Sequence, residues 1–477
     1  YRKSLTTLLK TACENVNSPA DLLNLLPTYV ERIFMANVTI TGYGDDLTIN
    51  GVRLGDLTPS QHEKIERENG GNNYSPLEDV VVSHVKDSST LIVRKPDPKD
   101  ISSYIEEELI DGLCCYSAVN QGQLNQTIVD AVVKHLTEEK LPTVPRSIRH
   151  KYMAGFLMAA TGVTGMDRVV PKVAGVEAPE LMFKLSRRWG YRIKGIPKNE
   201  AIVVAAKGNF HGRSMTAISL SDDPDAYEDF GPKLSGIELV EYNNIDALKS
   251  LFEEKGDRIA SYMVEPIQGE AGVIVPDKDY WPQVAALCKE YNILLAMDEV
   301  QTGFARTGAN FAHQLFGVKP DLMGCGKAAG GGILPVSFVA GSDEVIGVLT
   351  PGSEGSTFGG YPLGAVVATF AIKVMEDENL AQKAEERGEQ LISRFKAMQD
   401  KFPDKVKEVR GEGLLTAFEM HDEPNLDGHT VSVELLKQGV YAKETHHSTV
   451  RVAPALTISA DQIDRIADAI DNVVASL

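Results

Sequence analysis

The spacing of hydrophobic residues divides the chain into regions of different structure. From about residue 165, short apolar runs alternate with amphipathic stretches, which is typical of a mostly parallel sheet with helical crossovers. The predicted buried strands are "AIVVAA" at 201–206, "ASYMVEP" at 260–266 and "ILLAMDE" at 293–299, and the stretch 281–292 is predicted to be the helix between the last two. Because open α/β sheets bind ligands beyond the carboxyl ends of their strands, the residues that close these runs are candidates for a functional site.

After about residue 378 the pattern changes to one long amphipathic helix followed by shorter strand-like runs. The apolar stripe of this helix consists of Ala384, Gly388, Leu391, Phe395 and Met398. The strand-like runs "GLLTAFEM" and "TVRVAPAL" come next. We therefore predict a smaller α+β domain at 379–477.

Residues 1–62 are predicted to form an N-terminal helical extension. Ser18 and Pro19 are typical of a helix start, and the four leucines of the short helix that follows require cover by the main body or by another subunit. The basic, leucine-containing stretch 1–16 has two interpretations, the tail of a transit sequence or an ordinary surface helix, and the acidic residues that follow favour the second. The predicted compartment is the mitochondrial matrix, with the cytoplasm as the alternative.

Composition limits the class of protein. The 477 residues are too many for one compact core, so two domains are expected. Lys and Arg number 48 against 67 Asp and Glu, and the formal charge of −19 repels nucleic-acid backbones. Apolar runs are shorter than the roughly 18 residues that span a bilayer. The five cysteines show no metal-type spacing and suit a reducing compartment. We therefore expect a soluble protein that acts on small molecules, without nucleic acid, membrane or metal.

Asp298 and Lys327 are the strongest candidates for chemistry. Asp298 ends a strand of apolar residues, where a carboxylate requires a cation or a hydrogen-bond donor. Lys327 follows after another short strand, and the glycines and alanines around it let a flat ring approach the backbone. Each residue alone has an ordinary explanation, a structural salt bridge or a solvated loop lysine. Together, a lysine that forms an imine with an aldehyde and an acid that keeps a pyridine nitrogen protonated are what pyridoxal phosphate requires.

Seven short motifs, within a similarity that runs from about Tyr74 to the C-terminus, resemble those of one enzyme family. They are "YSAVNQG" (116–122), "GVEA" (175–178), "GNFHGR" (208–213), "VEPIQGEAG" (264–272), "DEVQTGFARTG" (298–308), "GSTFGG" (355–360) and "RVAPAL" (451–456). Together they are similar to the class III aminotransferases, which are fold type I pyridoxal phosphate enzymes, and most closely to the ornithine aminotransferases. The resemblance implies a large α/β domain at 121–378 with a mostly parallel seven-stranded sheet between helices, and a segment at 63–120 that packs on the small domain.

The resemblance also implies how the ring of pyridoxal 5′-phosphate is held. Lys327 would bond covalently to the cofactor aldehyde and then carry a proton between substrate and cofactor. Asp298 would pair with the ring nitrogen. Gln301 would reach the ring hydroxyl, and Phe210 would stack on the face of the ring.

The cofactor phosphate is expected at the start of a helix. The backbone N–H groups of Gly175 and Val176 would hold it there, because free N–H groups and the helix dipole favour an anion. Ser356 and Thr357 would reach this phosphate from the neighbouring subunit. The implied assembly is therefore a homodimer with shared active sites, and residues 1–62 are a candidate contact for a higher oligomer.

Five residues match substrate-binding positions of the ornithine aminotransferases. Tyr74, Tyr116 and Arg213 would hold the α-amino and carboxylate groups away from the cofactor, so that the distal amine reacts. Glu270 would neutralise Arg451 in the first half reaction and release it in the second, when its planar fork grips the α-carboxylate of 2-oxoglutarate. The implied ping-pong reaction converts L-ornithine and 2-oxoglutarate to glutamate 5-semialdehyde and L-glutamate.

The chain also departs from the family pattern. Val173 and Ala174 replace the usual Asn-Thr before "GVEA", and His211 stands where ornithine enzymes commonly have Trp. The region 94–113 differs from the family's strand pair. These differences keep two alternatives open: another ω-aminotransferase, acting on acetylornithine, lysine or 4-aminobutyrate, and a non-catalytic assembly protein on the same fold.

Overall fold

The computed structural model describes residues 38–477 apart from 72, 75, 424 and 425. The chain divides into two compact units. The smaller one comprises the described residues up to 74 together with 79–81 and 94–105, and the larger one comprises the rest. The helix predicted after Ser18 and the stretch 1–16 lie outside the described residues.

The smaller unit contains a short antiparallel sheet and one helix. Strands β1 (Ile40–Thr41), β2 (Thr48–Ile49) and β3 (Val52–Arg53) pair in sequence order. Helix α3 (Pro59–Asn69) begins with a capping box, whose side chains accept hydrogen bonds from free N–H groups at the helix start. Its first residue is a proline, which has no N–H group that needs an acceptor. The described part of the predicted extension, 38–62, therefore contains short strands as well as the start of a helix.

The larger unit is built around a seven-stranded sheet with the order β7-β13-β12-β11-β10-β8-β9. The five strands from β12 to β9 are parallel to one another, and β13 is antiparallel to both of its neighbours. The mostly parallel sheet is thus confirmed, and the three predicted strands agree with β8, β10 and β11. The strands are β7 (Arg168–Lys172), β8 (Ile202–Ala206), β9 (Ile237–Val240), β10 (Ile259–Val264), β11 (Leu294–Asp298), β12 (Leu322–Cys325) and β13 (Ser337–Gly341).

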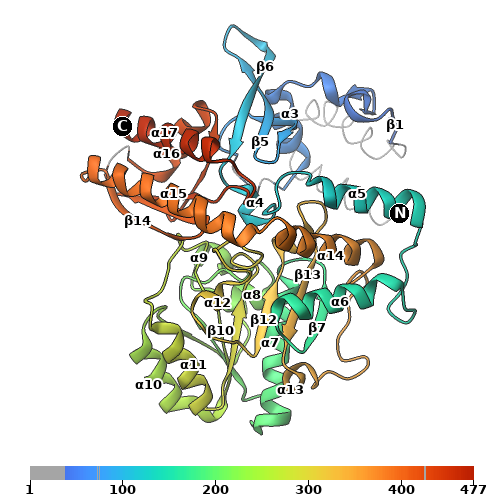
Figure 1. The fold of residues 1–477 in the computed structure, drawn as a ribbon, viewed down its shortest axis with the longest axis vertical. Helices are drawn as coiled ribbons and strands as arrows, with labels where there is room; N and C mark the ends of the chain where they lie inside the picture. Colours follow the sequence, from blue (N-terminus) through green and yellow to red (C-terminus); the bar gives the residue numbers. More distant parts are fainter. Residues whose placement is uncertain (1–37, 72, 75, 424–425) are drawn as a thin grey trace, which may run out of the picture. The chain divides into compact units, whose positions relative to one another are not determined.

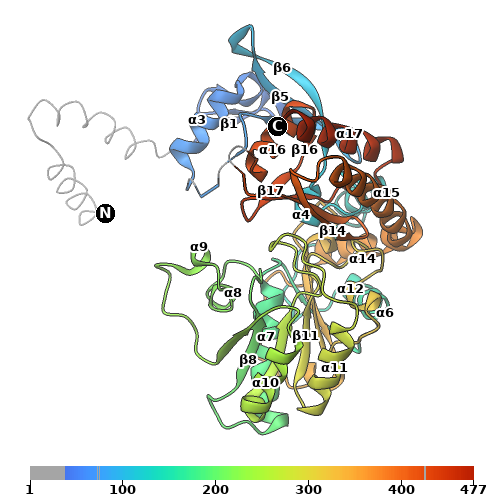
Figure 2. The ribbon, with the colours of Figure 1, turned by 90° about the vertical axis from the view of Figure 1, so that its left-hand side faces the viewer.

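Helices cover both faces of this sheet, because side chains alternate between two apolar layers along each strand. On one face, Val204 and Leu295 pack with α10 and α11, which lie next to each other in Figures 1 and 2. On the other face, Val203 and Ala296 pack with α7. Every residue of β8, β10 and β11 is buried, so a charged residue on these strands can reach a ligand only at a strand end. The helices are α7 (Glu177–Trp189), α10 (Ile245–Lys255) and α11 (Tyr280–Glu290).

The C-terminal part of the larger unit is a four-stranded antiparallel sheet, ordered β14-β15-β18-β17, with helices packed on it. All five predicted stripe residues of the long helix α15 are buried. Helices α15 and α17 lie side by side (Figure 2). The elements are β14 (Val406–Glu412), β15 (Leu415–Met420), β17 (Lys443–Thr445), β18 (Thr449–Val452), α15 (Leu380–Lys401), α16 (Gly428–Lys437) and α17 (Ala460–Ser476).

The structure contains further strands and helices besides those of the two sheets of the larger unit and the short sheet of the smaller unit. Among the helices that the structure describes, none combines the length and the hydrophobicity that crossing a bilayer requires. Four of the remaining strands form a sheet with the order β16-β6-β5-β4. The remaining elements include β4 (Val81–Asp87), β5 (Thr90–Asp97), β6 (Asp100–Asp111), α4 (Cys114–Ser117), α5 (Gln126–Lys134), α6 (Lys151–Thr164), α8 (Met215–Ser219), α9 (Pro224–Tyr227), α12 (Ala312–Leu315), α13 (Asp343–Ile346), α14 (Pro362–Asp377) and β16 (Val440–Tyr441).

We predict that Gly388→Ala destabilises the protein, because α15 crosses the turn at Gly413 without room for a side chain. A Cβ at position 388 would lie 1.9 Å from the carbonyl oxygen of Gly413, so the backbone must shift. The expected loss is about 1–3 kcal/mol in the free energy of unfolding, measured by chemical denaturation. Gly162→Ala is the control. Gly162 is an exposed position inside α6 with open space around it, and alanine there should add up to about 1 kcal/mol. Effects of the same sign would contradict this packing argument.

Candidate functional site

A cavity lies at the carboxyl ends of the parallel strands, where the sequence predicted a site. Asp298 is the last residue of β11 and pairs in register with Gly324 of the neighbouring strand β12. Lys327 follows two residues after β12 and begins the short helix η6 (Lys327–Gly330). The start of α7 supplies the wall opposite. The cavity is lined by Gly175, Val176, Pro179, Phe210, His211, Gly212, Glu265, Asp298, Val300, Gln301 and Lys327. The structure thus brings six of the eight predicted cofactor residues together.

Lys327 is placed for reaction by strain and by desolvation. Its backbone φ is 44°, a left-handed value that a residue with a side chain adopts only when its surroundings enforce it. Its Nζ donates a hydrogen bond to Gln301 Oε1 at 3.2 Å. Desolvation lowers the pKa of Lys327 below its ordinary value, although the negative charges of Asp298 and Glu265 oppose this effect. A larger share of neutral amine makes Lys327 a better nucleophile and base.

Asp298 is buried, and each of its oxygens has a partner. Oδ1 accepts a hydrogen bond from the backbone N–H of Val300 at 3.0 Å, and Oδ2 lies 2.7 Å from Nδ1 of His211. Because a carboxylate can only accept, Nδ1 of His211 carries the proton. The sequence placed His211 in a candidate strand-end segment and marked it as a departure from the family, but nothing in its local pattern pointed to this contact.

Glu265 is a second buried carboxyl group in the cavity wall and was not assigned a role from the sequence. Its two oxygens accept hydrogen bonds from the backbone N–H groups of Phe210 (3.0 Å) and Gly269 (3.3 Å). Burial raises the pKa of Glu265 to about 7, with the nearby charge of Asp298 adding to the shift and the charge of His211 opposing it. The sequence did single out Glu265 as a residue at the carboxyl end of strand β10, but did not assign it a contact.

The start of α7 fits an anion. Glu177 Oε2 accepts the backbone N–H groups of Val173 and Ala174, both at 2.8 Å. Among the described residues, the N–H groups of Gly175 and Val176 have no acceptor. These two free donors lie at the positive end of a 13-residue helix and match the phosphate of pyridoxal phosphate. The nearby lysine matches its aldehyde, and the buried carboxylate matches its ring nitrogen. The cavity therefore fits this cofactor.

Arg451 and Glu270 form an ion pair whose charges act on Lys327. Arg451, on β18, is 2% exposed, and its Nη1 donates to Glu270 Oε2 at 2.7 Å. The glutamate side chain is 40% exposed, whereas the arginine side chain is buried. Thr445 holds the backbone of Glu270 by donating its hydroxyl to the carbonyl oxygen at 2.6 Å. The guanidinium of Arg451 also lies 5.3 Å from the centre of the Tyr116 ring.

Tyr116 is presented by a turn that sequence patterns do not reveal. The four residues 114–117 of α4 all have left-handed φ values, between 46° and 70°. Such a conformation costs about 1–2 kcal/mol per residue with a side chain. Asp111 supports the turn, because its Oδ1 accepts the backbone N–H groups of Leu113 and Cys114. Strain held in this way is typical of a functional segment.

The other predicted residues are distributed around the cavity or outside its lining. The guanidinium of Arg213 lies 5.7 Å from the centre of the Phe210 ring, at the cavity wall. Ser356 and Thr357 do not line the cavity, and their contact with a cofactor was predicted across a subunit boundary. Tyr74 belongs to the smaller unit and is 87% exposed. The roles of these four residues stay predictions.

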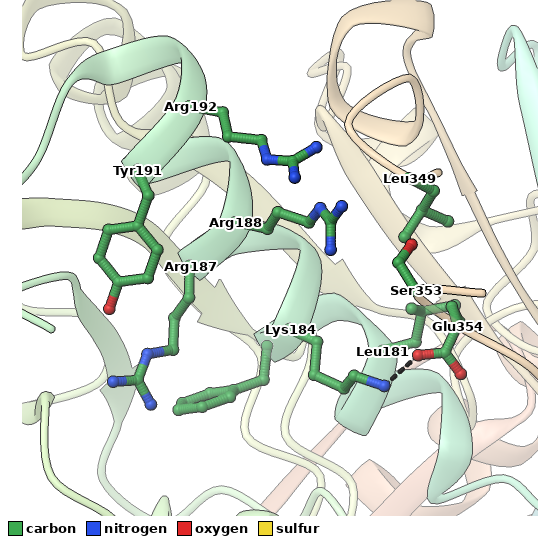
Figure 3. A pocket seen from close by; sticks show the side chains of 10 residues that line it. Leu181, Lys184, Arg187, Arg188, Tyr191, Arg192, Leu349, Ser353 and Glu354 are labelled. Carbon is green, nitrogen blue, oxygen red and sulfur yellow. Dashed lines mark hydrogen bonds and ion pairs between the residues drawn. The ribbon is translucent and has the colours of Figure 1, made fainter. Parts of the chain in front are cut away.

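A second cavity at the opposite end of α7 shows how the segment before Ser356 is anchored (Figure 3). Arg188 and Arg192 both donate to the carbonyl oxygen of Val348, at 2.8 and 3.1 Å, and Lys184 pairs with Glu354. Basic residues at this end are also favoured by the negative end of the helix dipole. Helix α7 therefore offers free donors to an anion at its start and holds the segment 348–354 at its end.

We predict that Cys115→Gly stabilises the protein. Cys115 is exposed and has a φ of 46°, so glycine removes left-handed strain without loss of packing. The expected gain is roughly 0.5–1 kcal/mol in the free energy of unfolding, measured by denaturation. The control is Ala118→Gly, because Ala118 has an ordinary right-handed φ of −84° and should lose about 1 kcal/mol. A loss in both variants would show that the turn is not strained.

Comparisons with known proteins agree with this geometry. The family model "Aminotransferase class-III" matches residues 83–474. An ornithine aminotransferase of Emericella nidulans is 39% identical over 441 residues, which cover 90% of this chain and 93% of the relative. One from Oceanobacillus iheyensis is 40% identical over 420 residues, 88% of this chain and 100% of the relative. The crystal structure of the Toxoplasma gondii ornithine aminotransferase superposes with a TM-score of 0.81 at 33% identity, covering 88% of this chain and 96% of that one. The chain belongs to the class III aminotransferases and is a pyridoxal phosphate-dependent transaminase.

Proposed function

We propose that the protein is an ornithine δ-aminotransferase, which converts L-ornithine and 2-oxoglutarate to glutamate 5-semialdehyde and L-glutamate. The observation that carries this proposal is the pair of Arg451 with Glu270, whose charges both act on Lys327. A site that must accept a substrate without a carboxylate near its reacting amine, and then one with such a carboxylate, needs an arginine that can be neutralised and released. The names of the relatives from Emericella nidulans and Oceanobacillus iheyensis support the same substrate.

The residues of the cavity have distinct parts in this proposal. Pyridoxal 5′-phosphate, when bound, supplies an aldehyde for the amino group and a ring that stabilises negative charge at the reacting carbon. Lys327 takes a proton from the substrate carbon next to the reacting nitrogen, and its lowered pKa suits it to that task. Asp298 holds the ring nitrogen and Gln301 the ring hydroxyl. Phe210 covers one face of the ring and excludes water from it.

The phosphate of the cofactor is assigned to the start of α7. The free N–H groups of Gly175 and Val176 support this assignment. We propose that Ser356 and Thr357 complete the phosphate site of a partner subunit in a homodimer. The division into parts at 1–62, 63–120, 121–378 and 379–477 stays a prediction, as does a higher oligomer through 1–62.

Two substrates are distinguished at the other side of the cavity. Tyr74, Tyr116 and Arg213 are proposed to hold the α-amino and carboxylate groups of ornithine, so that the distal amine points to Lys327. During this step Glu270 keeps Arg451 neutralised. When 2-oxoglutarate enters, Glu270 turns out to solvent and Arg451 binds the α-carboxylate through two parallel hydrogen bonds.

The mitochondrial matrix remains the predicted compartment, with the cytoplasm as the alternative. The names of the Arabidopsis thaliana and Oryza sativa relatives include "mitochondrial", whereas other relatives are bacterial proteins. The relatives therefore support both compartments.

Titration with ornithine tests the function. The purified protein loaded with pyridoxal phosphate should lose the visible absorbance of the lysine-bound cofactor when ornithine is added, and 2-oxoglutarate should restore it. Lys327→Ala should abolish both the absorbance band and turnover, because no other amine is held at this point. Lys319→Ala, which removes an exposed lysine outside the cavity lining, should change neither. Turnover retained by Lys327→Ala would refute the assignment.

A panel of amine donors separates ornithine from its alternatives. Acetylornithine, lysine and 4-aminobutyrate are compared with ornithine, each with the wild type and with Arg213→Ala. Ornithine should be the best donor and should lose its advantage in the variant. Equal use of 4-aminobutyrate, which has no α-amino group, would count against the proposal.

We predict that Glu270→Gln separates the two half reactions. Arg451 keeps an uncompensated charge in this variant, which attracts carboxylates and disfavours the distal amine of ornithine. The rate constant kcat/KM for ornithine should fall about 10- to 100-fold, while that for glutamate in the reverse direction is retained. Stopped-flow absorbance measures each half reaction. Thr445→Val is the control, since it loosens the backbone of Glu270 but leaves its charge in place, and should change both half reactions in the same direction. Equal losses for both substrates in Glu270→Gln would argue against the switch.

A further inference from the structure

We propose that His211 is a positioning residue, which holds the carboxylate of Asp298 in the orientation and charge state that bind the ring nitrogen of the cofactor. The proposal rests on the cofactor assignment made above and assigns a role to a side chain that differs from the usual tryptophan. Its basis is the geometry of one hydrogen bond and the lack of any other partner for the same ring.

The imidazole of His211 makes a single polar contact in the structure. Its side chain is fully buried, Nδ1 lies 2.7 Å from Asp298 Oδ2, and Nε2 has no hydrogen-bond partner among the described residues. A buried nitrogen without a partner costs free energy, and an apolar ring would fill the same space without that cost. The contact with Asp298 is therefore the feature that a histidine adds at this position.

The backbone around His211 is built to aim the ring. Asn209 donates to the carbonyl oxygens of Ala206 and Leu220, at 2.6 and 2.7 Å, and Phe210 donates its N–H to Glu265. Gly212 has a φ of 116°, and a Cβ there would lie 2.5 Å from a methyl group of Val176. His211 is thus fixed on both sides, between the residue predicted to stack on the ring and the turn that packs on the phosphate site.

The charges around His211 favour its bond with Asp298. Burial alone would lower the pKa of His211, but the hydrogen bond and charge of Asp298, together with the charge of Glu265, raise it. Without this donor, Asp298 would keep only the N–H of Val300, and its second oxygen would be buried without a partner. The carboxylate would then no longer be fixed in the orientation that we propose for binding the ring nitrogen.

Cofactor binding to three variants tests the proposal. Dissociation constants are measured by absorbance and fluorescence for pyridoxal phosphate and for its deaza analogue, in which C–H replaces the ring nitrogen. His211→Phe should weaken pyridoxal phosphate binding about 10- to 100-fold and leave binding of the deaza analogue unchanged. His211→Asn, whose amide N–H can replace Nδ1–H, should restore most of the affinity for pyridoxal phosphate.

His313→Phe is the matched control. His313 is also buried and its Nδ1 lies 3.0 Å from the buried carboxylate of Glu299, one residue after Asp298, but neither residue lines the cavity. It should alter stability without changing affinity for either compound. Equal affinities of wild type and His211→Phe for pyridoxal phosphate would overturn the role of His211. Equal losses for both compounds would also overturn it, because they would show a general structural effect. Failure of the wild type itself to bind pyridoxal phosphate would instead refute the proposed function.

Discussion

The carboxylate of Asp298 stands at the end of a strand that is buried along its whole length, and the site is arranged around the need to compensate that charge. The parallel strands of the sheet are open to solvent or to a ligand only at their ends. A carboxylate on β11 can therefore meet a ligand only at the end of the strand. A buried charge without partners costs several kcal/mol. Val300 and His211 supply two donors, and the remaining space in front of Asp298 faces Lys327 across the cavity. In the proposed function, the ring nitrogen of the cofactor would complete the compensation.

The same requirement explains the substrate side of the cavity. Arg451 is almost fully buried, and Glu270 compensates its charge. Because the glutamate side chain is partly exposed, the replacement by a substrate carboxylate that we propose would cost little in solvation. In this proposal, the exchange of one carboxylate for another lets a single pocket take two substrates.

Rigid supports hold these exchangeable charges in place. The left-handed turn at 114–117 sets the ring of Tyr116 beside Arg451, and Asp111 stabilises the turn from beneath. Helix α7 contributes at both ends, with free donors at its start and arginines that hold the segment 348–354 at its end. Strain and helix electrostatics are thus located where the chain must present a side chain or a backbone donor to a ligand.

The sequence by itself determined three neighbouring strands of the sheet and the residues that end them. Local periodicity predicted the buried strands β8, β10 and β11 and the apolar stripe of α15, because this pattern depends on neighbours a few positions apart. The end of an apolar strand singled out Asp298, and the small residues around it singled out Lys327. Tertiary structure alone decided that His211 meets Asp298, that Glu265 lines the same cavity, and that four residues at 114–117 turn left-handed. His211 and Asp298 are separated by 87 positions and meet because β8 and β11 both flank β10 and end at the same edge, and no local pattern encodes that order. The left-handed turn is likewise imposed by Asp111 and the packing around it, against the intrinsic preference of each residue.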